Sequence, residues 1–154
     1  MIKAMNWNRY LIAPLVLCIA YLIFTVLQYD KVKDQNEVLQ KANDALFKVQ
    51  LNNALSSFEM EVNDYTYRSM LANVSNAAVL SELTTFEQAN DDLDISLNNL
   101  YIALREDKSK DLTLARIDEL RNIFTMLVRN PASKTATERM NWITDETFFD
   151  NKNE

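Results

Sequence analysis

The sequence predicts an all-α protein, in which an N-terminal transmembrane helix is followed by an extracytoplasmic, antiparallel four-helix bundle. The 154 residues include no glycine and only two prolines, Pro14 and Pro131. Because tight hairpin turns usually need glycine or asparagine at positive φ, a fold rich in sheets is not expected. A long apolar run near the N-terminus predicts the membrane helix, and apolar residues repeated at helical spacing predict the bundle.

The apolar run covers residues 10–29, which we interpret as the transmembrane helix. No charged side chain occurs between Leu11 and Leu27. At ~1.5 Å per residue, about 20 helical residues cross a bilayer core of about 30 Å. Cys18 then serves as a small apolar side chain within the helix. Aromatic residues of the kind found at membrane interfaces flank the run at Trp7, Tyr10 and Tyr29.

The charges on either side of the run predict its orientation. Lys3 and Arg9 precede it without any acidic residue, whereas Lys and Asp are mixed after it. The positive-inside rule therefore places residues 1–9 in the cytoplasm and residues 30–149 outside, as the periplasmic or extracellular part of a bacterial inner-membrane protein. Residues 150–154 are polar and predict a disordered tail.

A cleaved signal peptide and a lipoprotein signal are the alternatives to an uncleaved anchor. Cleavage needs a short apolar core and a small-x-small site, and the segment from Thr25 to Tyr29 offers no such site. Lipoprotein signals resemble a pattern with a small residue directly before the cysteine, but Leu17 precedes Cys18. We therefore expect an uncleaved signal anchor.

The first helix is expected to continue out of the membrane to about Ala72. A break is expected at residues 73–76, because asparagine is the best residue for a left-handed helix end when glycine is absent. Before this break, the apolar positions fall into two registers separated by a shift, which in a coiled coil is a stutter. The first register comprises Leu39, Ala42, Leu46 and Val49, and the second comprises Leu51, Leu55, Phe58, Val62, Tyr65 and Ala72.

The second helix is expected to run from about Ala77 to Arg105. Its apolar residues alternate at spacings of four and three, which indicates the seam of a coiled coil. Asn90 lies on this seam, where it either fixes the register or oligomeric state or occupies a partly exposed position. The seam comprises Val79, Leu83, Phe86, Asn90, Leu93, Leu97, Leu100 and Leu104.

Two further helices complete the expected bundle. Residues 106–111 predict a charged turn before a third helix, from about Leu112 to Arg129, which ends because the residue before Pro131 disfavours helix. Residues 135–138 match a capping box for a short fourth helix that reaches about Phe149. These polar breaks favour helical hairpins over one continuous rod.

The composition argues against most enzyme classes and against nucleic-acid binding. There is no histidine, a single cysteine and no glycine, so the commonest general base, multi-cysteine zinc sites and Gly-rich phosphate loops are absent. Nothing marks a particular pair of carboxylates as catalytic. From Asp30 onward the chain has 14 Lys and Arg against 22 Asp and Glu, whereas nucleic-acid binding needs an excess of basic residues. We expect no catalytic residue, no cofactor and no metal.

One part of the pattern resembles a known class of receptor domain. The segment Tyr67 to Leu71 (YRSML), then Val79-Leu80, then the heptads from Phe86 to Leu100 are similar to the corresponding parts of bacterial extracytoplasmic four-helix sensor domains. These include the sensor domains of methyl-accepting chemotaxis receptors and the CHASE-type domains of histidine kinases and cyclases. The resemblance covers about residues 10–149 and implies a role in signal transduction, as a dimer.

The departures from this class shape the expected function. CHASE-type domains usually carry glycine near the arginine, where this chain has Ser69 and Asn73. The sequence shows no second membrane helix and no cytoplasmic output domain, so we expect a fragment of a receptor, a degenerate sensor or a partner of another membrane protein. We expect a single-pass inner-membrane protein that binds a ligand or a protein without catalysis, as a homodimer or with another membrane protein. The runner-up is a phage spanin-like lysis protein or another envelope tether, which forms an extended coiled coil.

Arg68 is the candidate ligand-binding residue, with Tyr65 and Tyr67 beside it in the sequence. A guanidinium binds a carboxylate or phosphate through two hydrogen bonds, and an aromatic ring can stack nearby. The alternatives are an ordinary surface pair between Arg68 and Asp64, which are spaced i, i+4, and a contact between subunits, where Arg and Tyr are enriched.

The C-terminal aromatic residues Trp142, Phe148 and Phe149 are a second candidate site. They either bind a partner protein or cover the end of the bundle.

Overall fold

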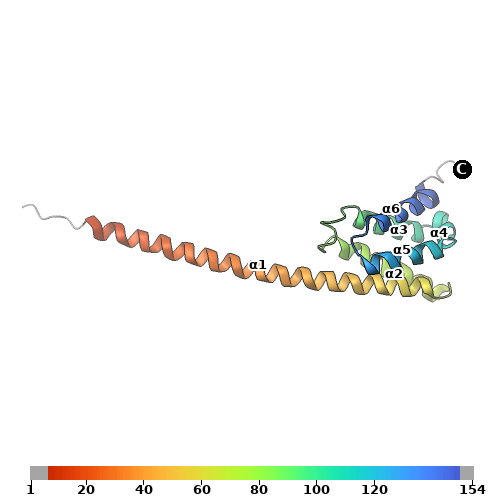
Figure 1. Cartoon of the computed structure of the whole chain (residues 1–154), viewed down its shortest axis with the longest axis horizontal. Helices are drawn as coiled ribbons and strands as arrows, with labels where there is room; N and C mark the ends of the chain where they lie inside the picture. Colours follow the sequence, from red (N-terminus) through yellow and green to blue (C-terminus); the bar gives the residue numbers. More distant parts are fainter. Residues whose placement is uncertain (1–6, 150–154) are drawn as a thin grey trace, which may run out of the picture. The chain divides into compact units, whose positions relative to one another are not determined.

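The computed structural model describes residues 7–149, with side chains from residue 14 onward. All of the regular structure within this range is helical (Figure 1), as predicted. Residues 1–6 of the expected cytoplasmic segment and residues 150–154 of the expected tail lie outside the described range, as do the side chains of Trp7 and Tyr10. The chain divides into two compact units, Met1–Leu39 and Gln40–Glu154, which are described separately below.

Helix α1 (Trp7–Glu59) confirms the predicted long apolar N-terminal helix. Pro14 lies inside it, beyond the first turn, so its missing N–H removes one hydrogen bond of the helix. By length and composition, α1 contains a stretch that is apolar enough to cross a membrane. The large apolar side chains from Leu15 to Leu27 are exposed, so no other part of the described chain covers them.

The C-terminal part of α1 belongs to the second unit and carries two apolar faces. One face is fully buried and comprises Phe47, Leu51, Ala54 and Phe58. The other face is exposed: Leu46 and Val49 each keep 52% of their surface. The shift of register that we interpreted as a coiled-coil stutter is therefore the change from the exposed face to the buried face of one helix.

Helix α1 ends at Glu59, so the predicted continuation to Ala72 is wrong. A capping box at the start of α2 (Asp64–Ser81) stops it. The Asn63 side chain accepts hydrogen bonds from the backbone N–H groups of Tyr65 (3.0 Å) and Thr66 (3.1 Å). In return, the Thr66 hydroxyl accepts one from the Asn63 N–H at 2.8 Å. These bonds satisfy the free N–H groups of a new helix, and the chain turns back at this point.

The predicted break at residues 73–76 is also wrong, because α2 runs through it. Asn73 tolerates the helix because its side-chain amide donates to the Ser57 hydroxyl (2.8 Å) and to the Asn53 carbonyl (3.2 Å) of α1. Val74 is fully buried beside it. The polar residues that suggested a helix end are thus the contact between α2 and α1.

The predicted helix 77–105 is interrupted by a loop, residues 82–92, before α3 (Leu93–Arg105). Asp44 of α1 holds this loop, since its two carboxylate oxygens accept from the N–H (2.8 Å) and the hydroxyl (2.7 Å) of Thr85. The first half of the predicted seam is therefore not a helical seam, and Val79 and Leu83 are exposed. The second half is confirmed as a buried stripe: Leu93, Leu97, Leu100 and Leu104.

The remaining elements are α4 (Asp107–Leu114), α5 (Ile117–Arg129), α6 (Lys134–Thr144) and the π-helix η1 (Asp145–Phe149). The expected charged turn at 106–111 is mostly α4, and the expected third helix is divided at residues 115–116. The predicted end of that helix before Pro131 is confirmed. The expected capping box at 135–138 is wrong by two residues, because Ser133 caps α6 by accepting from the Ala136 N–H.

Each of the longer helices of the second unit contributes buried side chains to its core. Helix α3 packs against α2, α4 and α6, and α5 packs against α6. In Figure 1 these helices gather beside the C-terminal part of α1. Phe58 of α1 meets Phe124 of α5 with ring centroids 4.9 Å apart. The fully buried side chains also include Met70, Val74, Leu93, Leu97, Leu100, Leu120, Leu127, Met140 and Ile143.

Candidate binding groove between α5 and α6

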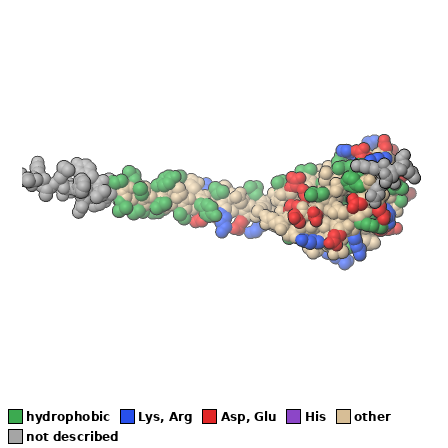
Figure 2. Space-filling model, turned by 90° about the horizontal axis from the view of Figure 1, so that it is seen from above, with side chains coloured by type: hydrophobic (Ala, Val, Ile, Leu, Met, Phe, Trp, Pro, Cys, Tyr) green, Lys and Arg blue, Asp and Glu red, His purple; other side chains and the backbone are tan. Residues whose placement is uncertain are grey.

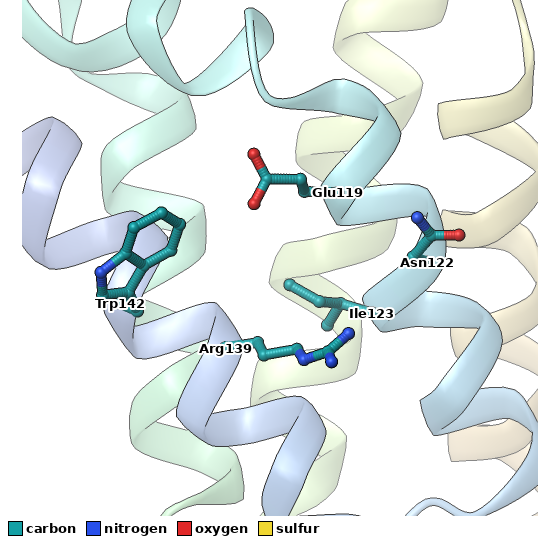
Figure 3. Close-up of a pocket in the computed structure, with 5 residues that line it drawn as sticks. All are labelled: Glu119, Asn122, Ile123, Arg139 and Trp142. Atoms are coloured by element: carbon teal, nitrogen blue, oxygen red, sulfur yellow. The ribbon is translucent and has the colours of Figure 1, made fainter.

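A groove of about 300 Å³ lies between α5 and α6. Glu119, Asn122 and Ile123 line it from α5, and Arg139 and Trp142 line it from α6 (Figure 3). Residues spaced i, i+3 lie on one helix face, which is why Glu119 and Asn122, and likewise Arg139 and Trp142, reach the same groove. Ile123 forms a buried apolar floor, while Trp142 is half exposed.

Arg116, at the start of α5, organises one side of this groove. Its guanidinium lies over the Trp142 ring, 4.5 Å from the centroid, a cation–π contact that fixes the indole. The same guanidinium donates to Glu119 at 2.7 Å and to Glu146 of η1. The single positive charge of Arg116 is thus shared between the carboxylates of Glu119 and Glu146, so Glu119 is paired but these three groups together keep one negative charge.

Arg139 differs from Arg116 because no ion pair among the described residues includes it. Its guanidinium makes only a long contact of 4.0 Å with the Met126 sulfur, which is a weak acceptor. A cation with free donors thus lines the groove, and its side chain extends toward Ile123, away from the Trp142 indole (Figure 3). This arrangement suits an anionic group attached to an apolar or planar group.

The described residues hold no group of three or more Asp, Glu or Cys side chains placed to bind a metal ion. The groove itself contains one amide, one carboxylate already paired with Arg116, one guanidinium and one indole. No nucleophile stands next to a base among these five side chains. The side chains that line the groove can offer charge, hydrogen bonds and stacking to a bound group.

The three residues predicted around Arg68 do not share one site. The Tyr67 hydroxyl donates to the Leu104 carbonyl at 2.8 Å, and the Lys110 ammonium lies over its ring at 4.1 Å. Burial, followed by the nearby carboxylates of Asp107 and Asp111, raises the pKa of Tyr67. Tyr67 therefore ties α2 to α3 and α4.

Arg68 and Tyr65 instead point to solvent, since both are exposed. The ion pairs of the described residues do not include Asp64 with Arg68. Arg68 thus remains a cation on an open helix surface, away from the groove.

The predicted aromatic site is divided in a similar way. Trp142 lines the groove, whereas Phe148 and Phe149 pack edge-on against each other at 4.8 Å on η1. The Lys108 ammonium lies 3.9 Å above the Phe148 ring. These contacts place Phe148 against α4, while Phe149 keeps part of its surface exposed.

Asn90 lies in the loop 82–92 and is buried. Its side-chain amide donates to the Thr137 hydroxyl of α6 at 3.4 Å. The residue that we placed on an oligomeric seam thus contacts another part of its own chain.

Glu87, in the same loop, has the most strongly shifted carboxyl. Burial, followed by the nearby Asp94 carboxylate, raises the pKa of Glu87 from 4.5 to about 7, although the hydrogen bond from the Asp94 backbone N–H acts in the opposite direction. The Glu87 carboxylate also accepts a hydrogen bond from the Asp94 N–H at 3.2 Å. This pair lies in the loop and at the start of α3, apart from the residues that line the groove.

Sequence reasoning identified Trp142 but missed Arg116, Glu119, Asn122 and Arg139. Their spacing along each helix was visible in the sequence, but the adjacency of α5 and α6 was not. Searches of protein-family models, of curated proteins and of solved structures with this chain gave no match. The residues themselves therefore carry the functional argument.

Proposed function

We propose that this is a single-pass inner-membrane protein whose helical unit, outside the cytoplasm, binds a ligand or partner protein without catalysis. One observation carries the proposal: the large apolar side chains of α1 between residues 15 and 29 are all exposed (Figure 2). Burying apolar surface is worth about 25 cal/mol per Å². A helix with this many exposed apolar side chains is therefore unfavourable in water and needs an apolar environment. Lipid supplies it for a helix of this length without charges.

The charges support the orientation with the N-terminus in the cytoplasm. Lys3 and Arg9 are the only charged residues before Asp30, which is the pattern of the positive-inside rule. The acidic second unit then faces the periplasm. Its packed helices, which return along α1, favour a sensor-like four-helix bundle over an extended tether.

The groove between α5 and α6 is the binding site that we propose within this unit. Arg139 supplies a free cation, and Trp142 supplies a planar apolar surface. We infer that the ligand or partner segment presents a carboxylate or phosphate to Arg139 and an apolar group to the indole. No cofactor is needed for this role.

The membrane assignment is tested by fractionation and protease protection. Two charges at the centre of the apolar run, Leu17→Arg with Leu22→Arg, are expected to release the protein from carbonate-washed membranes, because each arginine costs about 2.5–3.5 kcal/mol at a helix centre. The matched control, Gln40→Arg with Gln88→Arg, adds the same charge at exposed positions and is expected to stay in the membrane.

Protease added to intact spheroplasts is expected to digest the second unit of the wild-type protein. If that unit is protected until the cells are lysed, it lies in the cytoplasm and the proposed orientation is wrong.

A further inference from the structure

The exposed apolar face of α1 in the second unit has no partner within the described chain. It comprises Ala42, Leu46 and Val49, which we call the outer stripe; all three are exposed, although the neighbouring Phe47 is fully buried. The spacings of four and three residues are those of the a and d positions of a coiled coil. Toward the N-terminus the same register places the exposed Leu39 and Val32 at a positions, with the polar Gln35 at the d position between them.

The charges on α1 avoid this stripe. With Val32, Leu39 and Leu46 at a positions, the charged residues between 32 and 50 all fall at b, c and f positions, which point away from an a/d seam. The positions that flank the seam, e and g, carry only uncharged side chains in this range. The charged residues are Lys33, Asp34, Glu37, Lys41, Asp44 and Lys48, and the flanking residues are Asn36, Val38, Asn43, Ala45 and Gln50.

This distribution suits a second copy of the same chain. In a parallel pair, each g residue lies opposite the e residue of the next heptad on the partner helix. Val38 would lie opposite Asn43, whose amide donates to the Leu83 carbonyl of its own chain, and Ala45 would lie opposite the partly buried Gln50. No like charges meet across such a seam. A partner with a strongly charged face would find no opposite charges along the stripe.

We infer that two copies associate in parallel through the outer stripes of their α1 helices, with Leu46 packing against Leu46 and Val49 against Val49. The inference rests on the proposed function, because anchoring in one membrane orients identical copies in parallel and in register. It names the partner of this face as a second copy of the chain. The groove between α5 and α6 lies on other helices and stays available to a ligand.

The membrane is also needed for the strength of the association. The stripe from Val32 to Val49 covers little more than two heptads, and helices of about this length are marginal on their own in water. Confinement in a membrane raises the effective concentration of the second copy, which strengthens a weak contact without any new interaction.

Disulfide cross-linking of the full-length protein in native membranes tests this inference. Cys18 is the single cysteine, so Cys18→Ser provides a cysteine-free background. Leu46→Cys and Val49→Cys place single thiols on the outer stripe, and Lys41→Cys and Lys48→Cys place matched thiols on exposed c positions of the same helix. After mild oxidation, we expect Leu46→Cys and Val49→Cys to give several-fold more disulfide dimer than the two lysine variants.

Any of three results would overturn the inference: an equal yield of dimer at all four positions, no dimer at any of them, or a cross-linked product whose mass shows a different protein. Protease protection of the same membranes separates this failure from a failure of the proposed function. Correct topology without the position-dependent dimer rejects self-association alone, whereas a protected second unit rejects the orientation on which both proposals rest.

Discussion

Glu87 makes the stability of the second unit depend on pH. Burial and the neighbouring Asp94 raise the pKa of its carboxyl from 4.5 to about 7. Between these two values, the folded protein keeps a proton that the unfolded chain releases, so the contribution of Glu87 to stability falls as pH rises through this range. Because the carboxyl keeps some contact with water, we expect a loss on the order of 1 kcal/mol.

Replacing Glu87 with glutamine is expected to remove this dependence. Glu87→Gln keeps the shape of the side chain but has no proton to release, so its unfolding free energy at pH 8 is expected to exceed that of the wild type. Urea unfolding at pH 5 and pH 8 measures the difference. Glu82→Gln changes an exposed carboxyl in the same loop and serves as the control; an equal effect of both substitutions would show that net charge, not the Glu87 site, is responsible.

Arg139 is the residue on which the proposed groove depends. The chain has two tryptophans, so a Trp7→Phe background leaves Trp142 as the single tryptophan, whose emission can be excited selectively over that of the tyrosines. Succinate and inorganic phosphate, as probes of the anionic group, are expected to change Trp142 emission in a saturable way. Loss of one charged hydrogen-bond partner costs about 1.5–3 kcal/mol, so Arg139→Gln is expected to weaken this binding by about ten- to a hundredfold.

The matched control for the groove is Arg129→Gln, which removes the same charge from an exposed position at the end of α5. It is expected to leave the titration unchanged. If neither probe alters Trp142 emission, or if both variants weaken binding equally, the groove does not recognise anions through Arg139.

At the scale of the elements, the helical class, the apolar N-terminal helix and the helix end before Pro131 were predictable from the sequence, but most other helix ends were missed. Apolar spacing predicted one helix through Asn63 and another through the loop 82–92. The actual boundaries depend on side chains that bond to backbone groups, such as Asn63 with Thr66, and on a distant residue, Asp44, that holds Thr85. The capping contact between Asn63 and Thr66 is local and can be read from the sequence. The contact between Asp44 and Thr85 joins distant residues and exists only after folding.

The difference between local patterns and contacts made on folding also explains which residues of the candidate groove could be predicted. Trp142 was predictable because large aromatic residues near a chain end are informative by themselves. Its partners Arg116, Glu119 and Arg139 lie on two elements whose adjacency depends on the core between α5 and α6. Asn73 is a case in which tertiary contacts overrule a local pattern. Its residue type suggested a helix break, but its hydrogen bonds to Ser57 and Asn53 stabilise a continuous helix.

The capping box at Asn63 is expected to contribute measurably to stability. Loss of an asparagine N-cap typically costs about 1 kcal/mol, so Asn63→Ala is expected to lower the unfolding free energy by that amount. Asn63→Asp retains a side-chain oxygen and is expected to be nearly neutral. Urea unfolding of the two variants tests the assignment, and a neutral Asn63→Ala would mean that another interaction fixes the turn between α1 and α2.

At the scale of the whole molecule, α1 links two roles, because its N-terminal part carries the exposed apolar run and its C-terminal part belongs to the core of the second unit. Phe47, Leu51 and Phe58 are fully buried there. Burial of such side chains contributes about 1.5–3 kcal/mol each, and domains of this kind are stable by only about 5–15 kcal/mol. Without α1, the remaining helices are therefore expected to lose most of their stability.

Two fragments test this dependence by thermal unfolding followed by circular dichroism. Residues 40–154 are expected to unfold in one cooperative transition, and residues 64–154 are expected to show no cooperative transition. Folding of the shorter fragment with similar stability would mean that α1 is only attached to an independent domain. The expected result would instead make α1 a structural part of the binding unit. A change in packing around the groove between α5 and α6 could then reach α1 through the contact of Phe124 with Phe58, which is the coupling that a membrane-anchored sensor requires.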